Sequence, residues 1–452
     1  MIPMKYLNFV HLCDLFNWSV AYHFGTEHSY SDRYPLVALG VFLFRSKNII
    51  DVKDDIVYKR VTISTMGKGV SVRDERKGKN IGTKKQYRIN SGQFLVSKID
   101  ARNGAFGVVP LEADNAIITG NFWAYDVDYN LIDPHYLALI TRTQEFTSFC
   151  EKASNGTTNR HYLKEALFLS QQIPLSSLDE QRTIIQQHLN KNNQAKEIET
   201  AADKVVKKAQ KWLMDNLGIY INEEIKSHNI LQFIRYKSLE KWSISEIQRY
   251  NKYSYEEAKY KVAKIGDIIL SFEGGKTPST KCKEYWGEDV YWVSAKDMKE
   301  LYLSNIQDKL SQKGVEDTKL KVYPQGTILG VFRSGILRHS FPVCITTHPV
   351  TINQDLKAFG IDERKVNKLY FLFYLNLLQD IVLSVAMKKG VTVESINTDA
   401  FMEIPFICPP LDKQNEMVDH ILASYSEQKN LQQQASYLRT QAQQQFEQTI
   451  FE

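Results

Sequence analysis

Basic side chains gather in one glycine-rich stretch of the sequence, between Lys59 and Arg102. This stretch holds twelve Lys and Arg residues against three Asp and Glu residues, although the net charge of the whole chain is only +5. Five glycines interrupt the stretch, which places its cations on loops between short strands. Basic loops on a rigid scaffold are suited to neutralising the phosphates of a nucleic acid, and a solvated surface is the alternative interpretation.

Two further segments combine small polar residues with a cation, as loops that contact nucleic acid do. One runs from Ser154 to Arg160, and the other reads Arg333-Ser-Gly. Their side chains can hydrogen-bond to phosphates or base edges, although a helix-capping turn explains the first segment equally well. The sequence Gly275-Lys-Thr resembles a phosphate-binding loop. That motif requires glycine at the position of Leu270, so we do not expect nucleoside triphosphate binding.

The alternative to nucleic-acid binding alone is a DNA-modifying enzyme that acts by itself, either an adenine methyltransferase or a nuclease. The segment Asp133-Pro-His-Tyr136 resembles the Asp-Pro-Pro-Tyr motif of adenine methyltransferases, but it lacks the second proline and no Phe-x-Gly-x-Gly loop precedes it. We therefore interpret Asp133 as the N-cap of a helix. A nuclease would need clustered acids with a lysine, and Asp100 near Lys98 has no partner set. A coiled-coil scaffold without a DNA role is the third hypothesis.

The histidines and cysteines predict no metal site. His11, Cys13, His23 and His28 are close in sequence, but their spacing fits no standard zinc finger. The five cysteines are scattered without a CxxC pair, which is typical of a reducing compartment, so we expect a cytoplasmic protein. We expect neither a signal peptide nor a membrane partner, because no apolar run approaches the roughly 20 residues that a membrane span needs.

Two long helices are predicted to position these segments. Residues 178–217 contain no Gly or Pro, and their apolar residues recur near the helical period. Asp179 near the start and Lys211 near the end match the helix dipole. Residues 412–452 form a second such run, in which four residues with the spacing of a coiled-coil seam are Leu431, Ala435, Leu438 and Ala442.

The long helices end two copies of a larger module. Each long helix opens with the pattern Leu-Asp-x-Gln, the first at Leu178 and the second at Leu411, and an Ile-Pro pair stands shortly before each of them. Upstream residues match 234 positions apart, and these pairs are Tyr136 with Tyr370, Gly92 with Gly326, and Gly156 with Gly390. We therefore predict an internal duplication. The alternation of apolar residues and turns predicts strands, among them 57–63, 94–99, 122–127, 260–270 and 327–332.

Several segments together carry a family resemblance. They are Gly275-Lys-Thr-Pro-Ser-Thr280, Tyr285-Trp-Gly287, Trp292-Val-Ser-x-Lys-Asp297, Ser97-Lys-Ile-Asp-Ala-Arg-Asn-Gly104, Asn155-Gly-Thr-Thr-Asn159 and both Leu-Asp-x-Gln helix starts. With them, nearly the whole chain resembles the specificity subunit of a type I restriction–modification system. The resemblance implies an α+β fold with an internal pseudo-two-fold repeat. Two mixed α/β target recognition domains would be separated by two long antiparallel coiled-coil helices.

The resemblance also implies a division of the chain and a set of partners. Residues 1–178 and 218–411 would be the recognition domains, and residues 179–217 and 412–452 the spacer helices. Each domain would read one half of a bipartite double-stranded DNA site. The helices would set the spacing and dock two methyltransferase subunits, which restriction and translocase subunits join. The chain would be non-catalytic and bind no cofactor or metal, with S-adenosylmethionine, ATP and Mg on the partner subunits.

Helix length supports this scheme independently. Forty residues of helix reach roughly 60 Å, well over one DNA turn of about 34 Å. Base contacts would come from polar and basic loop residues. The candidates in the first module are Lys68, Arg73, Lys84, Lys85, Lys98, Arg102, Asn103, Thr158, Asn159 and Arg160. Those in the second module are Lys276, Thr277, Ser279, Lys296, Arg333, Ser334, Lys388 and Lys389. Because Arg333-Ser-Gly-Ile336 replaces Asp100-Ala-Arg-Asn-Gly104, we expect the two modules to read different sequences.

Overall fold

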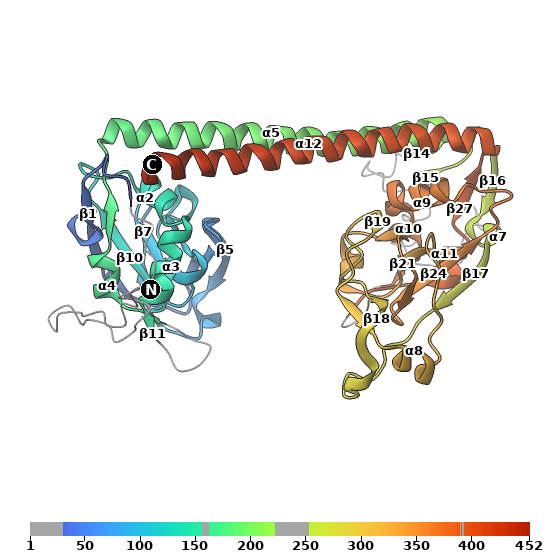
Figure 1. Ribbon diagram of the computed structural model, residues 1–452, viewed down its shortest axis with the longest axis horizontal. Helices are drawn as coiled ribbons and strands as arrows, with labels where there is room; N and C mark the ends of the chain where they lie inside the picture. The colour runs from blue at the N-terminus through green and yellow to red at the C-terminus, as the bar shows by residue number, and fades with distance from the viewer. Residues whose placement is uncertain (1–29, 156–161, 222–252, 389, 391–392) are drawn as a thin grey trace, which may run out of the picture. The chain divides into compact units, whose positions relative to one another are not determined.

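The computed structural model describes residues 30–155, 162–221, 253–388, 390 and 393–452 (Figure 1). The chain forms two compact units, one of residues 1–198 with 434–452 and one of residues 199–433. Each unit contains a mixed α and β body and a stretch of both long helices. The mixed fold class agrees with the prediction from sequence.

Both units are built on an antiparallel sheet with the same strand order. The order is β2-β10-β7-β8 in the first unit and β17-β24-β21-β22 in the second, where β19 is added parallel to β22. The strands are β2 (Leu43–Ser46), β7 (Phe94–Ser97), β8 (Phe106–Val108), β10 (Phe122–Val127), β17 (Ile269–Gly274), β19 (Tyr302–Leu303), β21 (Ile328–Val331), β22 (Val343–Thr346) and β24 (Leu356–Ile361). Tyr125 pairs with Phe94, and 234 positions later Phe359 pairs with Ile328. The strand register therefore confirms the predicted duplication.

Short helices pack beside each sheet and also correspond. They are α2 (Pro134–Ile140), α3 (Gln144–Lys152) and α4 (Glu165–Ser170) in the first unit, and α9 (Lys368–Leu377), α10 (Gln379–Ala386) and α11 (Thr398–Met402) in the second. The Asp133 carboxylate accepts a hydrogen bond from the backbone N–H of His135 at 2.8 Å, and Pro134 is the first residue of α2. The predicted helix start is thus confirmed.

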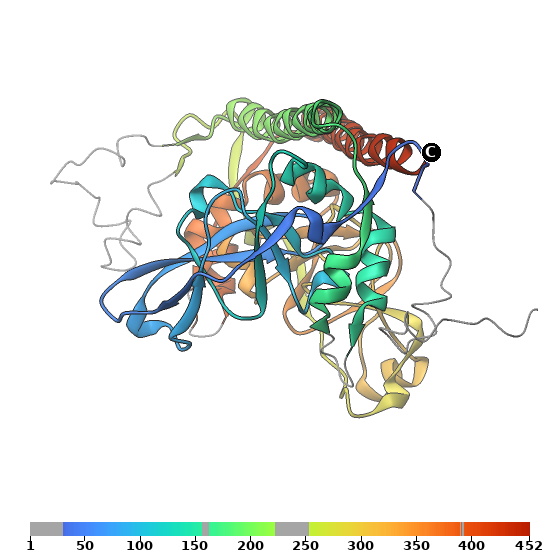
Figure 2. The same ribbon diagram turned by 90° about the vertical axis from the view of Figure 1, so that its left-hand side faces the viewer.

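The two units differ in what is inserted between equivalent strands. The chain between β2 and β7 forms most of a five-stranded sheet in the order β3-β6-β9-β4-β5, which Figure 2 shows in blue. Its strands are β3 (Ile49–Asp51), β4 (Val57–Ser64), β5 (Gly69–Lys77), β6 (Lys85–Arg88) and β9 (Ile117–Ile118). Between β17 and β21 the insert instead supplies one helix and two strands of a three-stranded sheet, β20-β18-β23, whose third strand, β23, comes after β22. Its elements are β18 (Trp286–Val293), β20 (Asp308–Leu310), α8 (Gln312–Thr318) and β23 (Val350–Ile352).

Two-stranded pairs complete each unit. They are β1 (Leu36–Ala38) with β13 (Gln172–Pro174), β11 (Ser154–Asn155) with β12 (Tyr162–Leu163), β14 (Tyr220–Ile221) with β15 (Tyr253–Ser254), β16 (Lys261–Lys264) with β27 (Pro405–Cys408), and β25 (Met387–Lys388) with β26 (Ser395–Ile396). The prediction of one strand over residues 260–270 is wrong. A single helical turn, α7 (Ile265–Ile268), separates β16 from β17, and the Asp267 carboxylate caps it by accepting a hydrogen bond from the backbone N–H of Lys264 at 2.9 Å.

The two long helices are α5 (Leu178–Leu217) and α12 (Leu411–Phe451), as predicted. A capping box starts α5, because Ser177 Oγ accepts from the N–H of Glu180 while the Glu180 carboxylate accepts from the N–H of Ser177. Gly218, with a φ of 74°, ends the helix. The helices lie side by side and antiparallel (Figure 1), since His188 reaches the carbonyl of Ala442 whereas the ring of Trp212 stacks on that of His420.

Small residues line the contact between these helices. Buried alanines recur at heptad spacing, and they are Ala195, Ala202 and Ala209 on α5 and Ala435 and Ala442 on α12. Leu431 and Leu438, between the buried positions of α12, are half-buried. The predicted seam is therefore confirmed, and its buried positions on α12 are alanines, whose small side chains let helix backbones approach one another.

A buried glutamine at the start of each long helix ties that helix to the body of its unit. Gln181 Oε1 accepts from the backbone N–H of Asp133 at 2.8 Å, and Nε2 donates to the carbonyls of Ser176 at 2.8 Å and Leu131 at 3.1 Å. Gln414, 233 positions later, repeats the arrangement, with its Oε1 bonded to the N–H of Asn367 and its Nε2 to the carbonyls of Pro409 and Lys365. Both side chains are completely buried.

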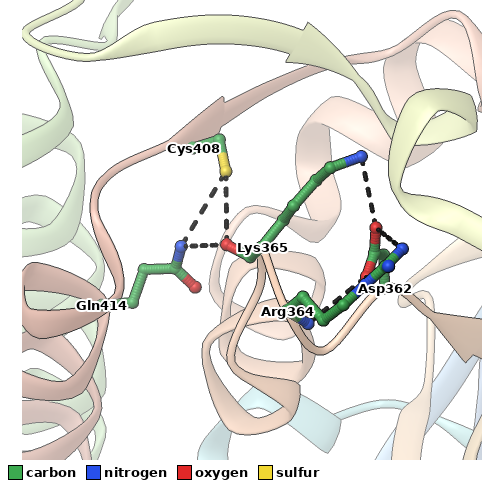
Figure 3. A network of polar contacts seen from close by, with 5 residues as sticks. All are labelled: Asp362, Arg364, Lys365, Cys408 and Gln414. Carbon is green, nitrogen blue, oxygen red and sulfur yellow. Dashed lines mark hydrogen bonds and ion pairs between the residues drawn. The ribbon is translucent and has the colours of Figure 1, made fainter.

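The turn from Asp362 to Lys365 contains one of the carbonyls that accept a hydrogen bond from Gln414, namely that of Lys365 (Figure 3). The Asp362 carboxylate accepts from Nε of Arg364 at 2.8 Å and Nη2 of Arg364 at 3.1 Å, and lies 3.2 Å from Nζ of Lys365. The side chain of Asp362 is 3% exposed. Its hydrogen bonds from Arg364, followed by those from Lys365, hold the pKa of the Asp362 carboxyl well below its ordinary value.

Because of Asp362, we expect the free energy of unfolding to fall in acid. A carboxylate whose pKa is lowered in the folded state stabilises that state above its ordinary pKa of about 4, and the stabilisation is lost as the pH falls toward the lower folded value. We expect Asp362→Asn to lower the free energy of unfolding at pH 7, and the difference from the wild type to shrink between about pH 4 and pH 2. Urea unfolding at both ends of this range checks it. Asp419→Asn, on the exposed side of α12, is the control. An effect of Asp362→Asn that is independent of pH would contradict this account.

In the described ranges, no single helix is long and apolar enough to cross a membrane. Only α9 and α10, bent by 66° at their junction, reach that length and hydropathy together. Both helices contribute buried residues to the core of the second unit.

Candidate nucleic-acid interface

In the first unit, the loop after β7 meets the turn of the β4–β5 hairpin. The backbone N–H of Met66 donates to the carbonyl of Asn103 at 2.7 Å, and that of Gly67 donates to the carbonyl of Gly104 at 3.1 Å. The fold therefore brings exposed Lys68 of the turn toward Arg102 and Asn103 of the loop. Residues more than thirty positions apart thus share one polar, basic surface.

The β4–β5 hairpin itself presents cations along the edge strand β5. Its acid Asp74 is neutralised by Arg60, whose Nε and Nη2 donate to the two carboxylate oxygens at 2.7 and 2.6 Å. These hydrogen bonds lower the pKa of the Asp74 carboxyl. Arg73 on β5 and Lys85 on β6 remain exposed. They fit phosphate binding, and charges on an edge strand also prevent unwanted strand pairing.

The second unit forms a corresponding surface from the loop after β21. The N–H of Ile396 donates to the carbonyl of Phe332 at 2.8 Å, just as the N–H of Leu163 donates to the carbonyl of Lys98 at 2.9 Å in the first unit. Through the bond from the N–H of Ser334 to the carbonyl of Glu394, the loop is tied to the β25–β26 pair. Arg333, Ser334 and Lys388 are thereby brought together.

Lys276, Thr277 and Ser279 lie on a segment that is held rigidly. The indole N–H of Trp292 donates to the carbonyl of Lys276 at 3.1 Å, and that of Trp286 donates to the carbonyl of Ser279 at 3.3 Å. Thr277 donates its hydroxyl to Gln354. The side chain of Lys276 is exposed and free to meet a ligand.

Two candidate cations have acidic partners in the fold. Lys84 Nζ lies 2.6 Å from the Asp54 carboxylate, and Lys296 Nζ lies 2.7 Å from that of Asp308. The hydrogen bond that Lys296 donates to Asp308 raises the pKa of Lys296. A paired cation has less charge to offer a phosphate, so the unpaired lysines and arginines are the better candidates. Thr158, Asn159, Arg160 and Lys389 lie outside the described residues, as do the histidines near the start of the chain.

Among the residues that the structure describes, no group of three or more His, Cys, Asp or Glu side chains could hold a metal ion. The cysteines there, Cys150, Cys282, Cys344 and Cys408, are all free thiols.

A model of one protein family matches both units. The type I restriction modification DNA specificity domain matches residues 41–208 and again residues 257–436. The chain belongs to this family. The two matches coincide with the duplicated modules, and they agree with the prediction of a specificity subunit rather than a catalytic chain.

Individual relatives match over shorter stretches. The specificity subunit of type I restriction enzyme MjaIX from Methanocaldococcus jannaschii is 29% identical over 161 residues, which are 35% of each chain. That of EcoR124I/EcoR124II from Escherichia coli is 28% identical over 178 residues, 38% of this chain and 44% of the relative. The chain thus spans less than half the length of each of these relatives. A solved structure concerning complex assembly and conformational transition of the type I R-M system has the same fold, with a TM-score of 0.52, 17% identity, and 93% of this chain and 98% of that chain covered.

Sequence reasoning missed one basic residue that the fold places beside Lys98, against the ring of Trp123. Arg45, on β2, lies over the rings of Trp123 and Tyr125. It stands apart from the basic stretch in sequence, and only the pairing of β2 with β10 brings it there. An arginine within the apolar strand Leu43–Ser46 was the available signal.

Proposed function

We propose that this chain is the DNA-recognition subunit of a type I restriction–modification complex. Each domain reads one half of a bipartite double-stranded DNA site, and the paired helices set the spacing between the halves. The helices also dock two methyltransferase subunits, and restriction and translocase subunits join that assembly. The observation that carries the proposal is that one chain holds two specificity domains with the same strand register and different inserts.

The division into functional parts follows the sequence repeat. Residues 1–178 and 218–411 are the two recognition domains, and residues 179–217 and 412–452 are the spacers. The glutamine at the start of each helix supports this division, because its three hydrogen bonds fix the helix to the domain it follows. If each recognition domain is fixed to its spacer helix, the length of the helix sets the separation of the two half-sites on the DNA. A protein that recognises chromosomal DNA in this way works in the cytoplasm.

Deleting the gene should remove a two-part adenine methylation motif from the genome of the source cell, and restoring the gene should return it. Methylome sequencing of the three strains checks this. A methylome that is unchanged by the deletion would overturn the proposal.

The alternative, a DNA-modifying enzyme that acts by itself, makes a different prediction. The isolated chain, incubated with DNA and labelled S-adenosylmethionine, should transfer no methyl group if it is the recognition subunit. Asp133 and Pro134, which carried that alternative, start α2 in the structure. A scaffold without a DNA role would show no salt-dependent gel shift, whereas phosphate binding weakens steeply as salt rises.

A further inference from the structure

Arg45 and Lys98 of the first unit both lie against the ring of Trp123. The guanidinium carbon of Arg45 is 5.6 Å from the ring centroid, and Nζ of Lys98 is 5.5 Å from it. The side chain of Arg45 is 17% exposed, and Lys98 is half-buried. Burial, together with the charge of Arg45, lowers the pKa of Lys98. Two cations are therefore held, partly desolvated, on one aromatic surface.

The protein compensates these two charges only in part. The nearby acid is Glu165, whose Oε1 lies 3.6 Å from Nη1 of Arg45 and accepts the hydroxyl of Tyr125 at 2.9 Å. Nε and Nη1 of Arg45 are buried and donate no hydrogen bond to any residue that the structure describes. In the described part of the chain, Nζ of Lys98 has neither a hydrogen bond nor an ion pair. Buried donors without acceptors destabilise a fold, so their presence needs a reason.

The second unit shows that the framework does not require these cations. Arg45 pairs with Tyr125, and the equivalent pair is Phe272 with Phe359. Lys98 corresponds to Phe332, since each carbonyl accepts the equivalent bond from Leu163 or Ile396.

Phe272 and Phe332 pack on one another and on Phe401, with ring centroids 5.0 to 6.3 Å apart. The cation there is Lys357, at the position of Trp123 and 5.3 Å from the ring of Phe272. The same framework therefore forms with apolar side chains at these two positions. The framework does not need the two charges that the first unit has there.

We propose that Arg45 and Lys98 form a receptor for a backbone phosphate of the DNA that the first unit contacts. This assignment rests on the proposed function and names the chemistry of one contact. A phosphate is favoured over a base edge, because the site has excess positive charge and only a phosphate brings a full negative charge. Lys98 directly precedes the loop of Arg102 and Asn103, so a phosphate held here would place that loop at the duplex.

The residues of the second unit supply the test variant. The double substitution Arg45→Phe with Lys98→Phe gives the first unit the residues that the second unit has at these positions, Phe272 and Phe332. Full-length wild type and variant are titrated with a duplex that carries the methylated motif, over a range of salt concentrations. We expect the variant to bind more weakly, with a slope of log affinity against log salt that is shallower by about 1. Thermal unfolding of both proteins verifies that the variant folds, and Arg45→Gln with Lys98→Gln provides a second pair if it does not.

Removing the acid distinguishes a phosphate receptor from a purely structural ion cluster. Glu165→Gln leaves both cations in place with less compensation, so DNA binding should become tighter. Lys204→Gln, which removes an exposed cation of α5, is the control for the loss of positive charge in the double variants. A structural cluster would instead show lower stability in every variant, with the salt slope unchanged, and that result would overturn the assignment.

Neutral methylphosphonate linkages, placed one at a time along the half-site, locate the contact. At one position the wild type should lose affinity while the double phenylalanine variant does not. Absence of any such position, or a loss that follows one base pair instead, would refute the phosphate assignment while leaving the proposed function intact. Failure of the wild type to bind any duplex would overturn the proposed function, and this assignment with it.

Discussion

Replacing Gln414 with leucine is expected to lower the free energy of unfolding by about 3–5 kcal/mol, and Gln181→Leu should have a similar effect. Leucine has nearly the same volume but can neither donate nor accept. Gln414→Leu leaves the N–H of Asn367 and the carbonyl of Pro409 unpaired where the side chain is completely buried. The carbonyl of Lys365 loses its amide donor and keeps the weak thiol donor Cys408. Each unpaired buried group costs about 1–3 kcal/mol. Urea unfolding monitored by circular dichroism measures the loss.

The control for this prediction lies on the same helix as Gln181. Gln194 is exposed on α5, so Gln194→Leu should change the free energy of unfolding by less than about 0.5 kcal/mol. Gln414→Glu is a second informative variant, because it keeps the acceptor but turns a carboxylate oxygen toward two carbonyls. We expect it to be at least as destabilising as leucine. A loss below about 1 kcal/mol for both Gln414 variants would mean that water replaces the side chain and that it does not anchor the helix.

The second large effect is expected at the aromatic centre of each unit. Phe168 and Phe401 are completely buried at equivalent positions, 233 residues apart. Phe168 contacts the rings of Phe106, Trp123, Tyr125 and Phe146. Phe401 contacts those of Phe272, Phe332, Phe341 and Phe359. Substitution by alanine removes most of these contacts and leaves a cavity, which costs about 3–5 kcal/mol.

Hydrogen exchange can separate the two substitutions. Phe168→Ala should raise amide exchange in the strands of the first unit, and Phe401→Ala should raise it in those of the second. The matched variants Phe168→Leu and Phe401→Leu should cost clearly less, because leucine fills much of the space. If either alanine variant left exchange in its own unit at the wild-type rate, the aromatic group would not be the centre of that unit's stability.

Much of the architecture is predictable from local patterns. The ends of α5, at Leu178 and Leu217, follow from a capping box at Ser177 and a glycine at Gly218, which act within a few residues. The duplication is also visible in the sequence, because both copies keep the residues that hold equivalent positions, such as Gln181 and Gln414. Local patterns fail where an apolar run changes direction, as at α7, because capping by Asp267 interrupts what reads as one strand.

The sequence by itself determined that this protein is a doubled mixed α and β module with two long helices and basic, glycine-rich loops. Those features depend on helical period, turn residues and repetition, which are all local or self-comparing signals. Only the tertiary structure decided which cations have acidic partners, as Lys84 has Asp54, and that Arg45 and Lys98 meet on Trp123. The physical reason is that strand pairing brings together side chains from distant parts of the chain, and neither composition nor spacing encodes their register.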